Sequence, residues 1–362
     1  MEMIKKDKWM YRSYWKILGV LLFIYVLIGG LGTPLKPGIY QLDAPTSAKP
    51  GEYVSIKVTG YNSTYAKAEK VEAWLKLDDG HYTSSLRNQV IDNERIIVNF
   101  LLPPASNKED YVPLTLIMYN EIDGPTVLPD AISLSPVTAQ SDTAAFTQWQ
   151  DQINSTLTPK SGILFPYRNI LHETIRNTFF HVALWLAMVI ILIAGLYHAI
   201  AYLRTKNMRN DKLSAAYNTT AIVYGLLGLA TGSIWARFTW GTWWTTDVKL
   251  NMAAIAMLIY LAYFILRSSI NDFDKRARFS AAYSIFGFVA LIPLIFVIPR
   301  MYDSLHPGNG GNPALGGEDL DNTLRMFFYP SIIAMILIGV WISSVFYRIK
   351  KVEEYILTSG DQ

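Results

Sequence analysis

Residues 179–203 read FFHVALWLAMVIILIAGLYHAIAYL, a run of apolar and aromatic side chains that contains no Asp, Glu, Lys or Arg. A helix of about 20 apolar residues, rising 1.5 Å per residue, crosses a hydrocarbon core roughly 30 Å thick. This stretch is long enough to span a membrane. It therefore predicts a membrane protein and excludes an ordinary soluble enzyme.

Five other stretches are similarly apolar, two of them with one lysine near the start (Lys16 and Lys249), which gives six predicted spans of about 19 to 25 residues. The spans are Tyr14–Gly32, Phe179–Leu203, Leu213–Trp235, Val248–Leu266, Phe279–Pro299 and Met326–Tyr347. Only 17% of all residues are charged, against about a quarter in soluble domains. We expect the first span to remain as an anchor, because its apolar core exceeds the roughly 7 to 15 residues of a signal peptide.

Lys and Arg gather beside alternate ends of the spans, as the positive-inside rule expects for cytoplasmic segments. The four clusters are Lys5, Lys6, Lys8, Arg12 and Lys16; Arg204, Lys206, Arg209 and Lys212; Arg267, Lys275, Arg276 and Arg278; and Arg348, Lys350 and Lys351. We therefore expect both termini to be cytoplasmic and residues 33–178, 236–247 and 300–325 to lie outside. The net charge of +3 is too small to indicate a nucleic-acid partner.

The large outer segment alternates apolar and polar residues in short runs between residues 38 and 136, with turn residues such as Asp78-Asp79-Gly80 between the runs. That pattern predicts an antiparallel β-sandwich. The fold class is thus a polytopic six-helix membrane protein with an inserted, extracytoplasmic all-β domain. The expected parts are 1–35 (cytoplasmic N-terminus and first span), 36–137 (sandwich), 138–176 (linker or surface segment), 177–350 (five-helix membrane region) and 351–362 (cytoplasmic tail).

Cysteine is absent from the sequence. The chain therefore forms no disulfide, no thiolate metal site and no thioether bond of its own. It also lacks the GxxxxGK[ST] pattern of a nucleotide-binding loop, so ATP chemistry would belong to a partner.

Thirteen residues between the third and fourth spans, WARFTWGTWWTTD from Trp235 to Asp247, hold four of the ten tryptophans. An aromatic belt at the membrane interface is one interpretation, but a belt is spread over all span ends. The alternative is an apolar platform made of Trp235, Trp240, Trp243 and Trp244 and flanked by charges at Arg237, Asp247 and Lys249. Such a platform suits a large flat amphiphile with an anionic tail, and haem has that shape.

His181 and His306 are placed by the topology at the same depth on the outer side, each near a span end. Two neutral imidazoles could supply axial ligands to haem iron, whereas a single interfacial histidine is usually only solvated. His172 could replace one ligand or pair with Glu173. His198 lies about 25 Å from His181 along the helix and cannot reach the same iron; His81 is expected to be solvated.

The run Gly232-Ser233-Ile234-Trp235, followed by Trp240-Gly241-Thr242-Trp243-Trp244 and Asp247, resembles the tryptophan-rich signature of haem-handling membrane proteins, most closely the CcmC type of cytochrome c maturation. The resemblance covers the first span and residues 168–350. It implies six spans, an outward-facing tryptophan loop and one functional histidine in each flanking outer loop, positions that His181 and His306 match.

The resemblance also implies that haem b is held at the outer face of a bacterial inner membrane, with the large loop periplasmic, and is passed to a CcmE-like chaperone. CcmA-, CcmB- and CcmD-like transporter subunits are the other implied partners, and no catalysis is expected. The chain departs from the family pattern at Thr246, where a Trp is usual, and at Ala183, where a Pro is usual.

Two alternatives stay open. A cytochrome c synthetase of the CcsA type also carries a tryptophan-rich loop and outer histidines, although such proteins generally have more spans. A membrane scaffold or transporter component without haem would use the tryptophans only as an anchor. The interiors of the predicted spans hold no acidic or basic residue, which counts against ion coupling but not against a scaffold.

Overall fold

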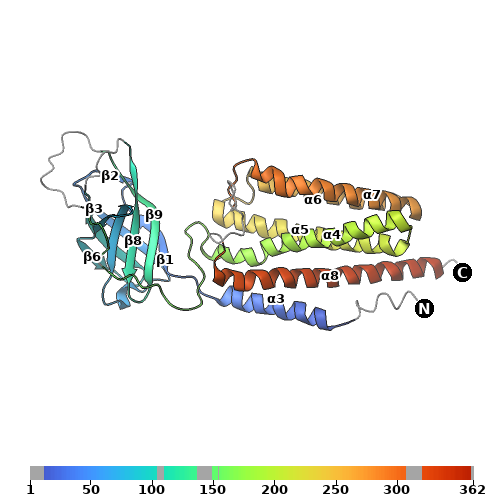
Figure 1. The fold of residues 1–362 in the computed structure, drawn as a ribbon, viewed down its shortest axis with the longest axis horizontal. Coiled ribbons are helices and arrows are strands. Elements are labelled where there is room, and N and C mark those ends of the chain that lie inside the picture. The colour runs from blue at the N-terminus through green and yellow to red at the C-terminus, as the bar shows by residue number, and fades with distance from the viewer. Residues whose placement is uncertain (1–11, 104–109, 137–148, 154, 307–319, 360–362) are drawn as a thin grey trace. The chain divides into compact units, whose positions relative to one another are not determined.

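A computed structural model divides the chain into two units, one helical and one built of strands (Figure 1). The helical unit comprises Met1–Gly32 and Glu173–Gln362, and the β unit comprises Thr33–His172. The structure describes residues 12–103, 110–136, 149–153, 155–306 and 320–359.

In the part of the helical unit that the structure describes there are six long helices, and each is long and apolar enough to cross a membrane. They are α3 (Tyr14–Gly32), α4 (His181–Thr205), α5 (Met208–Trp240), α6 (Val248–Ser268), α7 (Phe273–Ile292) and α8 (Asn322–Ser359). A 3₁₀ helix, η3 (His172–Phe179), precedes α4, while a π-helical turn, η4 (Pro293–Val297), and a 3₁₀ turn, η5 (Ile298–Arg300), follow α7. The prediction of six spans, with a β domain inserted after the first, is confirmed.

Several helices are longer than the predicted spans. Helix α5 covers 208–240 rather than 213–235, and α8 covers 322–359 rather than 326–347. The predicted ends were set by the first charged residues, but a helix continues into water wherever its backbone bonds and caps are satisfied. Asn207 caps α5 by accepting a hydrogen bond from the Arg209 amide at 2.9 Å, and Gly241 ends it with a left-handed φ of 77°.

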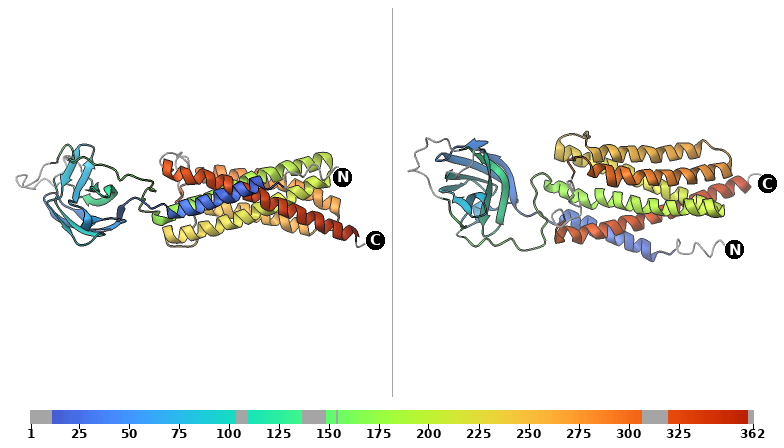
Figure 2. Two further views of the ribbon diagram at one scale, coloured as in Figure 1. Left: turned by 90° about the horizontal axis from the view of Figure 1, so that it is seen from below. Right: turned by 45° about the horizontal axis from the view of Figure 1, so that its top comes forward.

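Helices α3 and α8 lie side by side and cross (Figures 1 and 2). Pro330 lies inside α8 and has no amide hydrogen for the carbonyl of Met326, one turn earlier. The hydroxyl of Tyr25 on α3 donates to that carbonyl at 3.4 Å, and the Tyr25 ring stacks on Phe327 with 5.2 Å between ring centroids. Helix α3 thus supplies a partner for the backbone group that the proline leaves open.

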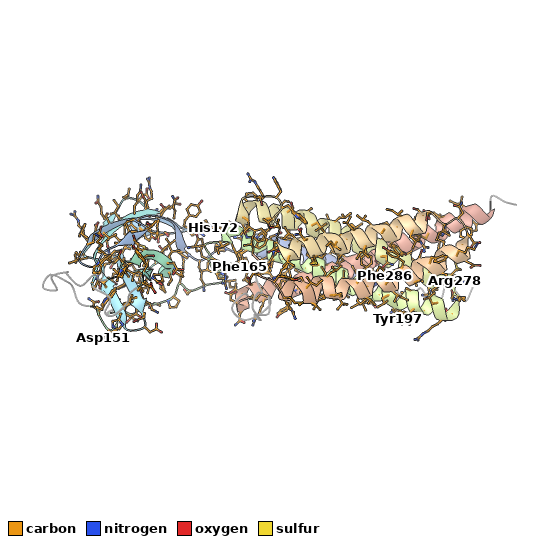
Figure 3. The ribbon with its side chains drawn as sticks, turned by 90° about the horizontal axis from the view of Figure 1, so that it is seen from above. Asp151, Phe165, His172, Tyr197, Arg278 and Phe286 are labelled. Carbon is orange, nitrogen blue, oxygen red and sulfur yellow. The ribbon has the colours of Figure 1, made fainter. Side chains whose placement is uncertain are left out.

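Arg267 on α6 and Asp211 on α5 form a buried ion pair with two parallel hydrogen bonds, both 2.7 Å. Asp211 is only 4% exposed. The pair lies just beyond the predicted spans 213–235 and 248–266, at the end of the bundle where Tyr197 and Arg278 also lie (Figure 3). It joins α5 to α6 at the end opposite the tryptophan-rich loop.

The described residues of the β unit form nine strands in two sheets. The strands are β1 (Gly38–Asp43), β2 (Ser47–Ala48), β3 (Tyr53–Tyr61), β4 (Glu72–Asp78), β5 (His81–Ser84), β6 (Arg87–Val90), β7 (Arg95–Leu101), β8 (Val112–Asn120) and β9 (Gly124–Leu134). A short 3₁₀ turn, η1 (Tyr65–Lys67), follows β3. The sheet orders are β1-β3-β7-β6 and β2-β9-β8-β4-β5, antiparallel except between β2 and β9.

Both sheets of the β unit face one core. In β3, Val54, Ile56 and Val58 are buried and alternate with exposed residues, and they share a cluster with Leu75 and Leu116 of the other sheet. Buried and exposed side chains alternate with a period of two, and this alternation allows the strands to be predicted from the sequence. The β unit is therefore a sandwich.

Residues 165–167, within the segment predicted as a linker or surface segment, pack on the β unit. Phe165 forms a parallel β-bridge with Leu35: its carbonyl accepts from the Lys36 amide at 2.8 Å, and its amide donates to the Pro34 carbonyl at 2.9 Å. Tyr167 stacks on Tyr61 with 5.3 Å between ring centroids, and a Cβ on Gly38 would lie only 1.9 Å from the Tyr167 ring. Glycine at position 38 is thus needed for the close approach of this ring.

We predict that Asp211→Ala destabilises the helical unit by about 3 to 5 kcal/mol, because it leaves the Arg267 guanidinium buried without its carboxylate. The apolar double variant Asp211→Leu/Arg267→Met should lose less, since it buries no unpaired charge. Thermal unfolding in detergent, followed by tryptophan fluorescence, measures both. A double variant that is less stable than Asp211→Ala would contradict this account.

Candidate functional site

A cavity of about 210 Å³ brings the two predicted ligands together between α4, α5, α6 and the segment after α7. Its lining consists of His181, Trp185, Leu186 and Val189 from α4; Gly228, Leu229, Gly232 and Ser233 from α5; Trp244; Lys249, Leu250 and Ala253 from α6; and Ile295, Phe296, Pro299 and His306. Most of these side chains are apolar. The two imidazoles and one ammonium group are the strongly polar groups among them.

His181, in the first turn of α4, is held by its Nδ1 atom. Nδ1 lies 3.0 Å from the carbonyl oxygen of Gly228 and 3.2 Å from the hydroxyl of Thr231. Because a carbonyl only accepts hydrogen bonds, Nδ1 carries the proton and Nε2 keeps its lone pair. The imidazole ring also meets Trp185 edge-on, with 6.4 Å between ring centroids.

Gly232 makes room for the His181 ring. A Cβ at position 232 would lie 2.6 Å from Cε1 of His181, well inside van der Waals contact. Gly228, one turn earlier on the same face of α5, admits the Trp185 ring in the same way, with a Cβ distance of 2.9 Å. Gly228 and Gly232 are four residues apart and so lie on one face of α5. The space they leave accommodates the Trp185 and His181 rings of α4.

His306 is held in the same manner by a carboxylate. Its Nδ1 lies 3.1 Å from Oδ1 of Asp247, which only accepts hydrogen bonds. Nδ1 thus carries the proton here too, and Nε2 keeps its lone pair. A carboxylate behind an imidazole is the usual outer partner of a metal-binding histidine, because it fixes both ring orientation and tautomer.

Asp247 binds more than the imidazole. It caps α6 by accepting from the Lys249 amide at 2.9 Å, and its other oxygen accepts from the Leu305 amide at 2.7 Å. Burial alone would raise the Asp247 pKa, but these hydrogen bonds, one from Ser304 and the nearby His306 outweigh it and lower the pKa. Asp247 is therefore a buried anion beneath His306 and not a charge on the rim.

His306 is neutral at pH 7. Burial lowers its pKa to about 4, even though the Asp247 carboxylate acts in the opposite direction. Since an imidazole binds a metal only in its neutral form, the burial of His306 favours ligation.

The four tryptophans do not form one flat platform. Trp235 and Trp240 lie on the last turns of α5 and surround the His306 ring, with centroid distances of 5.3 and 4.8 Å. Trp244 lines the cavity, and its Nε1 donates to Asn251 at 3.3 Å. Trp243 is 59% exposed. The structure thus places Trp235 and Trp240 in a collar around His306, Trp244 in the cavity lining and Trp243 on the outer surface.

The cation that lines the cavity is Lys249, whose Nζ donates to the His306 carbonyl at 3.5 Å. Arg237, which the sequence placed at the rim, donates instead to the carbonyl of Gly241 at the end of α5. Lys249 and Ala253 are one helical turn apart on α6 and both line the cavity. The sequence marks Lys249 only as one of the charges beside the tryptophans.

The other histidines lie elsewhere. His172 belongs to the β unit, like Phe165 (Figure 3), and its Nδ1 lies 2.9 Å from the Tyr167 hydroxyl. His198 bonds Asn210 at 3.1 Å and stacks on Tyr217, and His81 is half exposed and pairs with Asp78. None of the three lines the cavity.

The two departures from the family pattern do not remove a group from the cavity. Ala183 is fully buried in the helical core. Thr246 lines a larger, more open groove of about 700 Å³ on the far side of Asp247, together with Asn251 and Tyr302. The groove is larger, but its lining contains no histidine, so the smaller cavity is the better candidate site.

The family described as Heme exporter protein C matches residues 161–359, more than half of the chain. This range includes α4 to α8 and both cavity histidines but not α3 or the nine strands. The Heme exporter protein C of Bradyrhizobium diazoefficiens is 30% identical over 171 residues, 45% of this chain and 60% of that protein. That of Paracoccus denitrificans is 25% identical over 174 residues, 48% of this chain and 70% of that protein.

A shorter match is to the cytochrome c biogenesis protein CcsA of Prochlorococcus marinus. It is 46% identical over 59 residues, which are 16% of this chain and 19% of that protein. The chain thus spans only part of these relatives, about 60% of the length of the Bradyrhizobium protein.

We predict that Gly232→Ala displaces the His181 ring and costs about 1 to 3 kcal/mol of stability, as overpacking of a tight contact does. Gly287→Ala on α7 is the matched control, because a Cβ there would meet its neighbours at an ordinary 3.6 Å. Thermal unfolding in detergent measures both. Equal melting temperatures for the two variants would mean that position 232 does not confine the histidine.

Proposed function

The chain belongs to the heme exporter protein C family, and from that premise we propose that it carries haem as cargo, bound between His181 and His306. The observation that carries the proposal is that both imidazoles line one cavity, each anchored through Nδ1 so that Nε2 is left with a lone pair. Two such nitrogens supply the axial ligands of haem b. No catalytic step is required of the chain.

The size of the cavity supports transient holding. Its volume of about 210 Å³ is below the roughly 300 to 1,000 Å³ of sites that enclose a small ligand. Haem is larger than such ligands, so part of its edge would extend past the cavity, over Trp244 and the apolar wall of Phe296. A partly exposed cargo can be taken by a second protein without unfolding the site.

Lys249 is the residue that we assign to a haem propionate. It is the cation in the cavity lining, and an ammonium–carboxylate contact there would fix which edge of the porphyrin enters first. Trp235 and Trp240 would restrict the orientation of the His306 ring by packing against it, and Asp247 would act as its positioning residue. Arg237 would contribute by closing the end of α5.

The clusters of Lys and Arg support a topology with both termini in the cytoplasm. In that orientation the β unit and both cavity histidines lie on the periplasmic side of a bacterial inner membrane. Haem held there is at the face where a CcmE-like chaperone could receive it. CcmA-, CcmB- and CcmD-like subunits are the proposed partners for transport, since the sequence has no nucleotide-binding loop.

The second candidate function is a cytochrome c synthetase like CcsA, which the 59-residue match favours. Such an enzyme would attach haem to an apocytochrome directly. Thioether formation in a reconstituted membrane that contains the chain and an apocytochrome, but no haem chaperone, would support this candidate over delivery.

We predict that the purified chain shows the optical spectrum of low-spin haem with two nitrogen ligands, and that His181→Ala or His306→Ala abolishes this spectrum. The haem content of each variant should be lower than that of wild type by a factor of at least roughly ten. Loss of an outer partner alone weakens metal binding by about 10- to 100-fold, and here a ligand itself is lost. Added imidazole should partly restore the spectrum by filling the vacated position.

His172→Ala and His198→Ala are the controls, since neither histidine lines the cavity. They should keep wild-type haem content. If the cavity variants keep it as well, the assignment of the axial ligands is wrong.

We also predict that Lys249→Gln weakens haem binding by about 10- to 100-fold, the effect of losing one charge-assisted hydrogen bond, whereas Arg237→Gln changes it much less. Haem dimethyl ester, which lacks the propionate charges, provides the test. It should bind wild type and Lys249→Gln equally. A Lys249→Gln defect of the same size with the ester would show that Lys249 acts on the protein and not on the propionate.

A further inference from the structure

The last part of α8, residues 348–359, continues the helix for about 18 Å after the apolar span. Helix α8 has 38 residues, whereas about 20 suffice to cross a bilayer. Its C-terminal end extends past the neighbouring helices in each ribbon view (Figures 1 and 2). This part of α8 is therefore surrounded by water on at least one side.

An exposed apolar stripe follows this extension. Val345, Ile349, Val352 and Ile356 are spaced four, three and four residues apart, the repeat of a coiled-coil seam. Val352 is 57% exposed and Ile356 is 63% exposed. Both follow the basic residues Arg348, Lys350 and Lys351 that mark the headgroup level, so lipid does not cover them.

The charges beside the stripe fit a second, identical helix. With Ile349 and Ile356 at position a of the heptad and Val345 and Val352 at d, Arg348 occupies g and Glu353 occupies e. In a parallel pair, a g residue faces the e residue five positions later on the other helix. Arg348 of each copy therefore faces Glu353 of the other, and the helix is complementary to itself.

We propose that α8 pairs with α8 of a second copy of this chain, through a short parallel coiled coil over residues 345–356. Two copies inserted the same way in one membrane present parallel α8 helices about a two-fold axis along the membrane normal. Two heptads alone are too short to pair stably in water. Confinement to the same bilayer raises their effective concentration and makes the pairing feasible.

The test uses the natural absence of cysteine. Val352→Cys places one thiol in the seam, and Lys351→Cys places one about 100° around the helix, on a different face. In native membranes treated with copper phenanthroline, copper(II) accepts the two electrons when two thiols join and release two protons. Val352→Cys should give a disulfide-linked product of twice the chain mass, at least fivefold more than Lys351→Cys.

Charge reversal tests the register. Arg348→Glu in the Val352→Cys background should lower the yield of the dimer, and adding Glu353→Arg should restore it. Haem content of every variant serves as the folding control, because these residues lie outside the cavity.

Three results would overturn the proposal: equal cross-linking at positions 351 and 352, a product with the mass of a different protein, or a dimer that forms only when residues 2–11 are deleted. The last result would mean that the chain's own N-terminus covers the stripe.

Discussion

The hydrogen bonds of Asp247 connect the parts of the site to one another. One buried carboxylate begins α6, holds the backbone at Leu305 and carries the His306 imidazole. Each bond uses a lone pair of an anion that burial would otherwise disfavour, so the three segments stabilise the charge together. Because α6 and the segment after α7 meet at this residue, His306 is placed within the same cavity as His181 on α4.

The two histidine rings are oriented by different partners. His181 uses a backbone carbonyl on α5 and needs glycine at position 232, whereas His306 uses a carboxylate and a collar of two tryptophans. In both arrangements Nδ1 carries the proton and Nε2 keeps its lone pair. The cavity between them is small, and Lys249 is the cation in its lining. Under the proposed function, a site of this kind would favour capture of a flat, anionic metal complex and its later release over permanent enclosure.

Long apolar runs and period-two strands determine structure locally, so the six helices and the sandwich were predictable from the sequence. The sequence also predicts that His181 and His306 lie at one depth, and both line the same cavity, while their role as ligands stays a prediction. Three features depend on packing between distant segments and could not be predicted: the burial of Asp247 under His306, the turn of Trp235 and Trp240 toward that ring, and the buried pair between Asp211 and Arg267. The last lies outside the predicted spans, and an apolar run does not show which charged residues beyond its ends pair with one another.

The central claim is that one haem bridges the two imidazoles. A cryo-electron microscopy map of the full chain purified with haem tests it most directly. The account predicts porphyrin density between Nε2 of His181 and Nε2 of His306, with a propionate near Lys249. Density in the groove lined by Thr246 and Tyr302, or iron bound to only one of the two histidines, would contradict it.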